Sequence, residues 1–277
     1  MSTLLFSLII GYNTNEVKKH LIVDKVNDGI DCNSLFDGDL ICEQYKSGYR
    51  FSIDAVLLAH FVTVKKDDRI LDLGTGSGII LLILLYRYDK IIRNCAGIEV
   101  QDRLFSLAKN NILNNSYLEQ CTILHGDMRK IQDLCRAGSF DSIVCNPPFY
   151  PEHTGRMSTN REEKTARHQV TGEIDDFLAA AAYAVKNRGN IFFIYPADLL
   201  GEFILAASRY KFEVKKLRFV YSYPGSQKGA QLVLVHCSKN GGKGVYISEP
   251  LYVYTEKNGL YTREVDEYYQ KKGSLIT

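Results

Sequence analysis

The residues best suited to chemistry are Asn146–Phe149, an Asn-Pro-Pro-Phe run that follows an apolar stretch. Two adjacent prolines cannot continue a strand, because neither donates a ladder hydrogen bond and each fixes φ. The sequence therefore predicts a buried strand over 140–145 that ends in a rigid loop. An amide oxygen, a proline carbonyl and an aromatic ring suit a planar substrate with an NH2 group. The alternative is a Pro-Pro turn that only closes the strand.

A second candidate site is the glycine-rich loop at Asp72–Gly78, which follows one predicted strand and opens a helix. Glycines let the backbone turn sharply and approach a ligand closely, and open α/β sheets bind ligands at the carboxyl ends of strands. The dinucleotide pattern G-x-G-x-x-G fails because Ile79 takes the place of the third glycine, and no GK[ST] follows. A phosphate ligand is therefore disfavoured, and a tight strand–helix turn without a ligand is the alternative.

Three acidic residues, Asp72, Glu99 and Asp127, stand at the ends of three successive predicted strands. A carboxylate at the position of Glu99 can accept both hydroxyl hydrogens of a ribose. Asp127 could accept a hydrogen bond from an adenine amino group. One such residue is usually only solvated, but three in this order suit a cationic, adenosine-containing ligand better than a polyphosphate.

Apolar runs alternate with helical patterns from residue 69 onward, which predicts an α/β fold with helices on both faces of a mostly parallel sheet. The predicted strands are seven, at 70–73, 95–100, 122–125, 140–145, 190–195, 214–221 and 231–237. The predicted helices cover 79–88, 102–114, 174–185 and 199–210. The last two strands are joined without a helix through Tyr223–Ser226, so we expect the last strand to be antiparallel.

Composition sets limits on domains and partners. The chain has 277 residues, of which 45% are hydrophobic, enough for one good core. We expect an N-terminal extension and lead-in over 1–44, a catalytic domain over 45–240, and a β-rich tail over 241–277 packed on the same domain. A net charge of +2 allows only a local nucleic-acid patch. The apolar run at 4–10 is too short to span a bilayer, so no membrane partner is predicted.

The cysteines point to a reducing compartment. The chain has seven, an odd number without a CxxC pair. This pattern favours the cytoplasm and argues against a disulfide scaffold or a cysteine-based zinc site. The six histidines show no metal-ligand spacing either, so no metal is predicted, and nothing indicates an obligate protein partner.

The glycine loop, Glu99, Asp127 and Asn146–Phe149 together resemble, in order and spacing, the S-adenosylmethionine-dependent methyltransferases of the Rossmann-like class. The Asn-Pro-Pro-Phe run is similar to that of the branch that methylates exocyclic or amide nitrogens. Residues 44–59, 167–171, 217–220 and 224–225 resemble segments of the tRNA1(Val) adenine-37 N6-methyltransferase group. This resemblance implies a Rossmann-like class I fold, S-adenosylmethionine as cofactor and tRNA as substrate.

The resemblance also assigns roles to residues. The implied catalytic residues are Asn146, Pro147, Pro148 and Phe149. The implied cofactor-binding residues are Asp54, Asp72, Gly74, Thr75, Gly76, Gly78, Glu99, Asp127 and Asn146. In that family the glycine loop cradles the methionine part of the cofactor, and the two later acidic residues hold its ribose and adenine.

Residues 150–169 carry an excess of positive charge between the Asn-Pro-Pro-Phe run and the next predicted helix. Beside an adenine-sized pocket, this charge suits phosphate contacts with RNA; elsewhere it would be a solvated loop. The candidate RNA-binding residues are Arg156, Arg161, Lys164, Arg167 and His168.

The predicted activity is methyl transfer to N6 of an adenine in tRNA, at position 37 next to the anticodon. The alternatives are other nitrogen acceptors, namely an rRNA guanine N2, a DNA adenine N6 or a protein glutamine N5. A dehydrogenase is disfavoured by the glycine spacing, and a cofactor-binding protein without catalysis is disfavoured by the intact Asn-Pro-Pro-Phe run.

Overall fold

The computed structural model describes residues 29–46, 52–148 and 174–271. Its first element is a hairpin of β1 (Ile30–Leu35) and β2 (Leu40–Tyr45), antiparallel to each other. The short helix η1 (Phe36–Gly38) joins them, and its φ angles of 56°, 52° and 92° are left-handed. The turn drives the Phe36 ring into the core, where it stacks on Tyr86 with ring centroids 4.2 Å apart.

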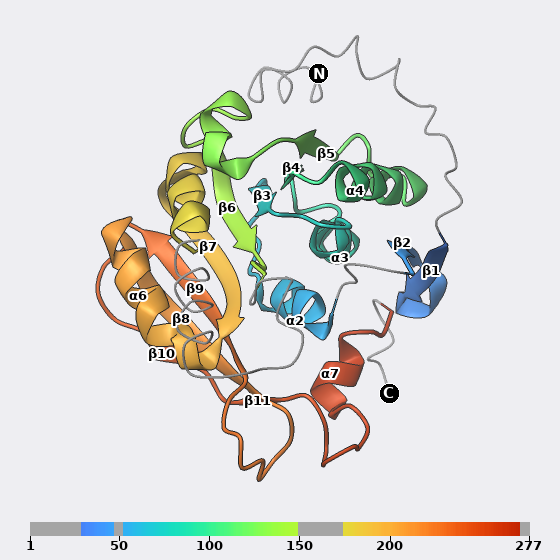
Figure 1. Ribbon diagram of the computed structural model, residues 1–277, viewed down its shortest axis with the longest axis vertical. Helices are drawn as coiled ribbons and strands as arrows, with labels where there is room; N and C mark the ends of the chain where they lie inside the picture. The colour runs from blue at the N-terminus through green and yellow to red at the C-terminus, as the bar shows by residue number, and fades with distance from the viewer. Residues whose placement is uncertain (1–28, 47–51, 149–173, 272–277) are drawn as a thin grey trace, which may run out of the picture.

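The centre of the molecule is a twisted sheet (Figure 1). Its main strands are β3 (Arg69–Leu73), β4 (Asn94–Glu99), β5 (Cys121–His125), β6 (Phe140–Cys145), β7 (Val185–Pro196), β8 (Phe212–Tyr221) and β9 (Leu232–Lys239). They lie in the order β8-β9-β7-β6-β3-β4-β5. β9 is antiparallel to both neighbours and the other pairs are parallel. The predicted fold class, with its antiparallel last strand, is confirmed.

Two short strands of the C-terminal tail extend this sheet beyond the seven that were predicted. β10 (Tyr246–Ile247) and β11 (Leu251–Tyr252) both pair in parallel with β8, giving nine strands within the described part of the chain. β7 is also longer than predicted, because it begins at Val185. The register between β6 and β7 shifts around residues 186–189, where Arg188 has a φ of 59°. This polar bulge has the composition of a loop, which is why sequence alone shortens the strand.

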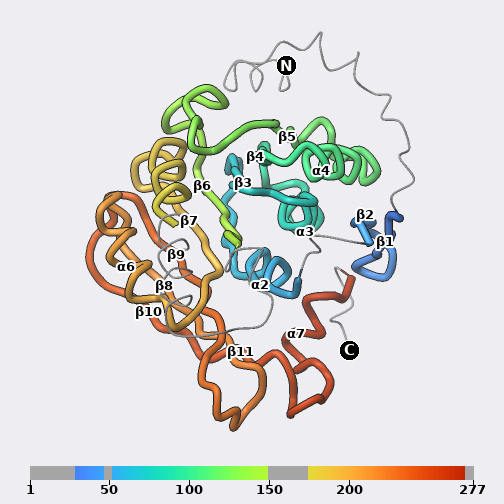
Figure 2. The backbone as a smooth tube through the Cα atoms, in the orientation of Figure 1, coloured from blue at the N-terminus to red at the C-terminus, as the bar shows by residue number. Residues whose placement is uncertain are grey.

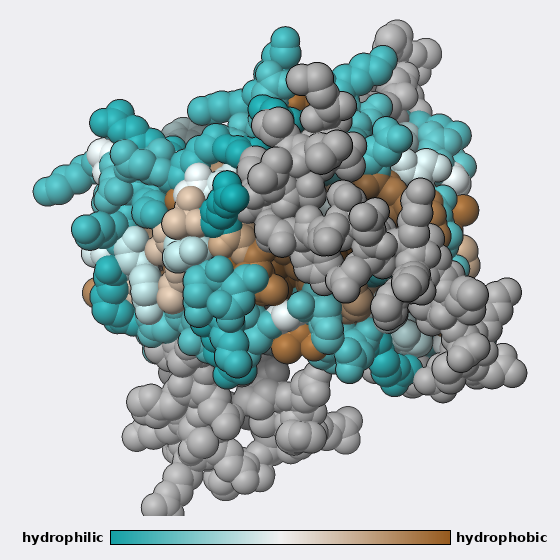
Figure 3. All heavy atoms as spheres, turned by 90° about the horizontal axis from the view of Figure 1, so that it is seen from above, coloured by the Kyte–Doolittle hydropathy of each residue, from teal (hydrophilic) through white to brown (hydrophobic). Residues whose placement is uncertain are grey.

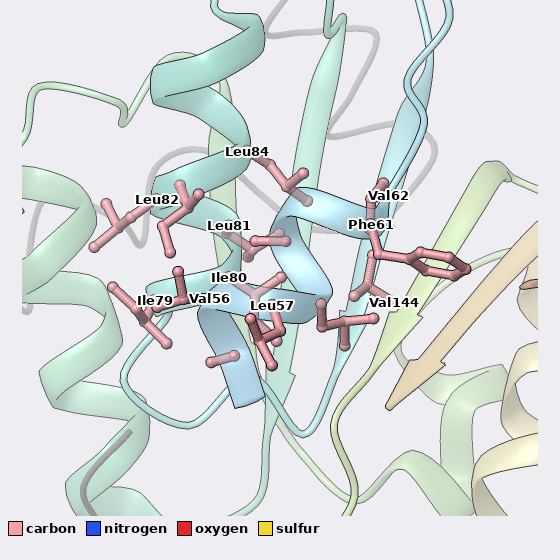
Figure 4. Packing of buried hydrophobic residues seen from close by; sticks show 14 of the residues in the cluster. Val56, Leu57, Phe61, Val62, Ile79, Ile80, Leu81, Leu82, Leu84 and Val144 are labelled. Carbon is pink, nitrogen blue, oxygen red and sulfur yellow. The ribbon is translucent and has the colours of Figure 1, made fainter. Parts of the chain in front are cut away.

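Helices cover both faces of the sheet, as predicted (Figure 1). The helices α2 (Ile53–Phe61), α3 (Ile79–Tyr88) and α4 (Asp102–Asn114) lie on one face, and residues 174–184 and α6 (Leu200–Arg209) lie on the other. Each face has its own core, and neighbouring residues of a strand point into different cores: Ile70 packs with the first set of helices and Leu71 with the second. Figure 4 shows the first core, where α2 and α3 meet Val144 of β6. Burial of one large aliphatic side chain there contributes about 1.5–3 kcal/mol.

The remaining helices are short: η2 (Met128–Asp133), η3 (Ala197–Leu199) and α7 (Arg263–Glu267). The tube in Figure 2 shows the tail running from β11 through α7 back toward the β1–β2 hairpin. The Lys271 ammonium lies 2.9 Å from the Asp39 carboxylate of that hairpin, and the Arg218 guanidinium lies 2.6 Å from the Glu264 carboxylate of α7. The second half of the described tail is therefore held by ion pairs to β8 and to the hairpin.

Polar residues dominate the described surface seen from above in Figure 3, with apolar side chains showing near its centre. All seven cysteines lie in the described ranges as free thiols. Across those ranges, the helices are too short or too polar to span a bilayer.

Candidate active site

The predicted site residues meet at the carboxyl edge of the sheet. β3 lies between β4 and β6, so the chain order reverses at this point. Such a reversal opens a crevice at the strand ends, where α/β sheets bind ligands. Leu73, the last residue of β3, is opposite Ile98 of β4 and Cys145 of β6. The glycine loop and Asn146 therefore emerge side by side from neighbouring strands, which are about 4.8 Å apart.

The glycine loop needs left-handed backbone at three positions. Gly74, Gly76 and Gly78 have φ angles of 71°, 58° and 81°. Residues other than glycine adopt such angles only at a cost in conformational energy. Gly78 is also the residue that begins α3 as its N-cap. The loop therefore turns within five residues from a buried strand into a buried helix.

The backbone amides of this loop are bonded within the protein. The amides of Gly74 and Thr75 donate to the Ile98 carbonyl at 3.0 and 2.9 Å, and the amide of Gly78 donates to the Thr75 carbonyl at 2.9 Å. A phosphate-binding loop instead aims its amides at the ligand. The geometry thus agrees with the glycine spacing in disfavouring a phosphate ligand.

Glu99 fixes the loop to the end of β4. Its Oε2 accepts a hydrogen bond from the Gly76 amide and its Oε1 accepts one from the Gln101 amide, each at 2.9 Å. The residue is only 5% exposed. Because a carboxylate oxygen has two lone pairs, each oxygen can accept one further hydrogen bond from a ligand hydroxyl.

Asp72 is a fully buried carboxyl group below the loop. Its Oδ2 accepts a hydrogen bond from the Thr75 hydroxyl at 2.8 Å, whereas its buried Oδ1 has no partner in the described structure. The pKa of Asp72 is raised to about 7, mainly by burial; the hydrogen bond from Thr75 opposes this rise and the nearby charge of Glu99 adds to it. A cationic ligand group would favour the ionised form of this carboxyl.

Gly97 of β4 provides the space that Thr75 occupies. A Cβ atom built on Gly97 would lie 2.8 to 2.9 Å from three atoms of the Thr75 side chain. Gly97 is also opposite Asp72 in the strand register. A larger residue here would push Thr75 away from the Asp72 carboxylate, so Gly97 belongs to the site although sequence analysis did not single it out.

Asp127 differs from the other two acidic residues because it is bound to a neighbouring cation. Its carboxylate accepts from the Arg129 Nε at 2.9 and 3.0 Å and from the Arg129 amide at 2.9 Å. This hydrogen bonding holds the pKa of Asp127 below its ordinary value. Its predicted contact with an adenine stays a prediction, and that contact would have to share the carboxylate with Arg129.

Asn146 follows β6 and is half-buried, Pro147 is buried and Pro148 is exposed. The strand ends where the prolines begin, as predicted. Phe149 lies outside the described residues. So do the candidate RNA-binding residues Arg156, Arg161, Lys164, Arg167 and His168.

Asp54 is in the first turn of α2, where a negative charge is favoured by the helix dipole. Burial raises the pKa of Asp54, and a hydrogen bond from Ser52 opposes this shift. α2 packs on α3, the helix that the glycine loop opens. Its predicted contact with the cofactor stays a prediction.

Two asparagines, one in α4 and one at its C-terminal cap, were not predicted to support the site. Buried Asn111 donates from Nδ2 to the Ser77 carbonyl of the glycine loop at 2.9 Å, and its Oδ1 accepts from the Glu43 amide at 2.8 Å. Asn115, four residues on, exchanges two hydrogen bonds with the backbone of Ile41. The pair binds β2 to α4 and to the loop, and its sequence signal is two asparagines one helical turn apart.

The site fits S-adenosylmethionine better than the ligands of other glycine loops. Asp72 offers an unpartnered carboxyl oxygen to a cation, Glu99 offers acceptors for a ribose, and the loop amides of Gly74, Thr75 and Gly78 are used internally. Within the described ranges, no three side chains of His, Cys, Asp and Glu form a group that could hold a metal ion.

Comparisons with known proteins agree with this geometry. The family model for the methyltransferase small domain matches residues 50–222. A Phocaeicola vulgatus protein named tRNA1(Val) (adenine(37)-N6)-methyltransferase is 28% identical over 177 residues, which is 63% of this chain and 71% of that protein. A Photobacterium profundum protein of the same name is 25% identical over 217 residues, 78% of this chain and 88% of that protein.

The fold has solved counterparts. A structure described as a predicted O-methyltransferase from Agrobacterium tumefaciens matches with a TM-score of 0.63 and 19% identity, covering 80% of this chain and all of that one. Fold and site together define a Rossmann-like methyltransferase whose cofactor is S-adenosylmethionine. The chain belongs to the methyltransferase small domain family.

Proposed function

We propose that this protein transfers a methyl group from S-adenosylmethionine to N6 of an adenine in tRNA, at position 37 next to the anticodon. The observation that carries the proposal is the placement of Asn146 and Pro147 at the end of β6, directly beside the glycine loop after β3. The names of the P. vulgatus and P. profundum relatives support adenine as the base and tRNA as the molecule.

The glycine-loop side of the crevice would hold the cofactor. Asp72 would face its cationic amino-acid part, Glu99 its ribose hydroxyls, and Asp127 its adenine amino group. When bound, the cofactor supplies an activated methyl group on a sulfonium. The protein keeps this end preassembled, because Glu99 and Thr75 are already in place through hydrogen bonds to Gly76 and Asp72.

The β6 side of the crevice would hold the acceptor base. The N6 lone pair of adenine is delocalised into the ring, which makes it a poor nucleophile. If the Asn146 side-chain oxygen and the Pro147 carbonyl accept the two N6 hydrogens, the nitrogen can pyramidalise and direct its lone pair at the methyl group. This effect is one of orientation and electrostatic stabilisation. The surplus proton leaves to solvent after transfer.

Base stacking and phosphate contacts complete the proposal. Phe149 would stack on the flipped adenine, an interaction worth about 1–3 kcal/mol. Arg156, Arg161, Lys164, Arg167 and His168 would contact RNA phosphates, and we expect removal of Arg161 or Arg167 charge to lower both RNA affinity and its salt dependence. A tRNA substrate also favours the cytoplasm as the compartment.

Mass spectrometry of tRNA nucleosides from cells with and without this gene tests the function. The proposal predicts loss of N6-methyladenosine from one tRNA and its return with the intact gene but not with an Asn146→Ala copy. Unchanged tRNA together with a loss of methylated rRNA guanine, DNA adenine or protein glutamine would assign the enzyme to that other acceptor.

A further inference from the structure

A small hollow lies at the same sheet edge as Asn146, on the side away from the cofactor loop. It has a volume of about 170 Å³. Its lining includes the apolar residues Ile53 and Leu57 of α2 and Leu232 of β9, together with Tyr221 and Tyr254. Ser222 and Gln231 add polar groups. Pockets for drug-sized ligands measure roughly 300–1,000 Å³, so this hollow suits a single ring system.

The strand register places the hollow close to the acceptor end of the crevice. β9 is two strands from β6, which corresponds to roughly 10 Å. Leu232 of β9 is opposite Pro196, the last residue of β7, so the hollow opens at the carboxyl end of β7. Leu57 and Val144, the latter two residues before Asn146, point into one cluster (Figure 4). α2 therefore reaches from the hollow to the end of β6.

Two tyrosines line this hollow, and three more are linked to them through ring contacts. Tyr221 is 5.5 Å from Tyr252 between ring centroids, and Tyr254 stacks on Tyr261 at 5.4 Å with 22° between the ring planes. Tyr261 in turn stacks on Tyr269 at 5.7 Å with parallel planes. Tyr254 and Tyr261 are 36% and 38% exposed. We call these five residues and the hollow the tyrosine surface.

The tail pre-orders part of the tyrosine surface. An isolated antiparallel bridge fixes the backbone of Tyr254 opposite that of Tyr261, and the Thr255 amide donates to the Leu260 carbonyl at 2.9 Å. Stacked rings that are already ordered lose little conformational entropy when a flat ligand binds them. The surface is therefore built to receive a planar group.

The charge around the tyrosine surface argues against phosphate as the main contact. Arg263 is paired with Glu267 at 2.8 Å, and Arg218 is paired with Glu264 at 2.6 Å. Aromatic platforms bind unpaired bases through their faces and need no base-specific hydrogen bond. The chemistry of the surface thus matches exposed nucleobases rather than the RNA backbone.

We propose that the tyrosine surface binds unpaired bases that flank the methyl-acceptor adenine in an RNA loop. One base occupies the hollow between Tyr221 and Tyr254, and the next packs against the exposed edge of the Tyr254–Tyr261 pair. This inference rests on the proposed function. It adds a substrate-recruiting surface in which every tyrosine except Tyr221 comes from the tail beyond residue 240, outside the 50–222 segment matched by the family model.

The test measures the affinity of the full-length protein for an unmodified RNA hairpin with adenine in its loop, by fluorescence anisotropy at several salt concentrations. Tyr221→Leu and Tyr254→Leu should each weaken binding by about 5- to 100-fold, with the salt slope unchanged because no phosphate contact is lost. Tyr254→Phe keeps the ring and should bind like the wild type. Tyr246→Leu is the matched control, since Tyr246 is 64% exposed on β10, beside Lys216 of β8 and far from the carboxyl edge.

The outcomes separate this inference from the proposed function. If the wild type methylates the RNA but both leucine variants, shown by thermal melting to be folded, bind it normally, the tyrosine surface is overturned and the function stands. If RNA is bound through the tyrosines but never methylated, the function fails and the surface stands. If Tyr254→Leu instead converts a dimer to a monomer in light scattering with RNA affinity unchanged, the surface is a contact between two copies of this chain, which also overturns the proposal.

Discussion

The two ends of the crevice are built differently. At the β3–β4 end, Glu99 is 5% exposed and Asp72 is fully buried, and both are held by hydrogen bonds from the glycine loop. At the β6–β9 end, Asn146 is half-buried, Pro148 is exposed, and a hollow with tyrosine rings lies beside them. A preassembled pocket suits one small ligand of constant shape, whereas an open aromatic edge suits part of a macromolecule.

The largest loss of activity should come from a substitution at the β6–β9 end, which would hold the acceptor base. Asn146→Ala should lower the methylation rate by on the order of 10²- to 10³-fold, since it removes one preorganised polar contact to the reacting group. Cofactor affinity, measured by calorimetry, should change much less, although Asn146 is also a candidate cofactor contact, because the loop after β3 is untouched. Asn187→Ala, at an exposed position in the bulge at the start of β7, is the control. If Asn146→Ala instead loses cofactor binding, the two ends of the crevice do not have separate roles.

At the β3–β4 end, which would hold the cofactor, a substitution should lower cofactor affinity more than the methylation rate. Glu99→Gln should weaken S-adenosylmethionine binding by roughly 10- to 100-fold, because hydrogen bonds to a charged group are lost and an NH2 group then faces a backbone amide. The methylation rate at saturating cofactor should change much less. Calorimetry and saturation kinetics measure the two quantities, with exposed Glu249→Gln as the control. Equal loss in rate and affinity would mean that Glu99 also acts on the acceptor.

The buried carboxyl should make stability depend on pH. The pKa of Asp72 in the folded protein is about 7, above its ordinary value of 3.8. The folded state therefore binds more protons than the unfolded state between about pH 4 and pH 7, and stability falls as pH rises through this window. Asp72→Asn should remove more than about 1.4 kcal/mol of that pH-dependent loss, the equivalent of one pKa unit. Denaturant unfolding at about pH 4 and pH 7 measures the unfolding free energy of each protein. If that free energy changes equally with pH in the wild type and in Asp72→Asn, the assignment is contradicted.

Of the substitutions at acidic residues, that of Asp127 should have the smallest effect on cofactor affinity. It is half-buried, and its carboxylate is occupied by Arg129. Asp127→Asn should weaken cofactor binding by about fivefold or less, because Arg129 already occupies both carboxylate oxygens and an ion pair near the surface contributes little. A loss as large as that of Glu99→Gln would show that Arg129 releases the carboxylate to the ligand.

Sequence patterns predicted the strands and helices that have a regular apolar periodicity. They missed the features that depend on tertiary contacts. The seven main strands, α4 at 102–114 and the antiparallel β9 follow from apolar periodicity and link length. The early start of β7 could not be predicted, because its bulge has the composition of a loop. Asn111 and Gly97 were missed for a related reason: their roles come from Ser77 and Thr75, which approach them only in the folded chain.

The candidate site divides in the same way. Asp72, Glu99 and Asn146 were predicted from position at strand ends, and the structure brings them to one edge. The difference between Glu99 and Asp127 was not predictable, because it depends on which hydrogen-bond donors each carboxylate meets. Tyr254 of the tail could not be assigned to the hollow from sequence, because the pairing of β11 with β8 brings it there only in the folded chain.

The most direct test of the account is methyl transfer by the purified protein to unmodified tRNA transcripts with S-adenosylmethionine, followed by mass spectrometry of the nucleosides. The account predicts one N6-methyladenosine per molecule of a single tRNA, none when adenine 37 is replaced by guanine, and almost none with Asn146→Ala. A methyl group on another atom, or undiminished methylation by Asn146→Ala, would contradict it.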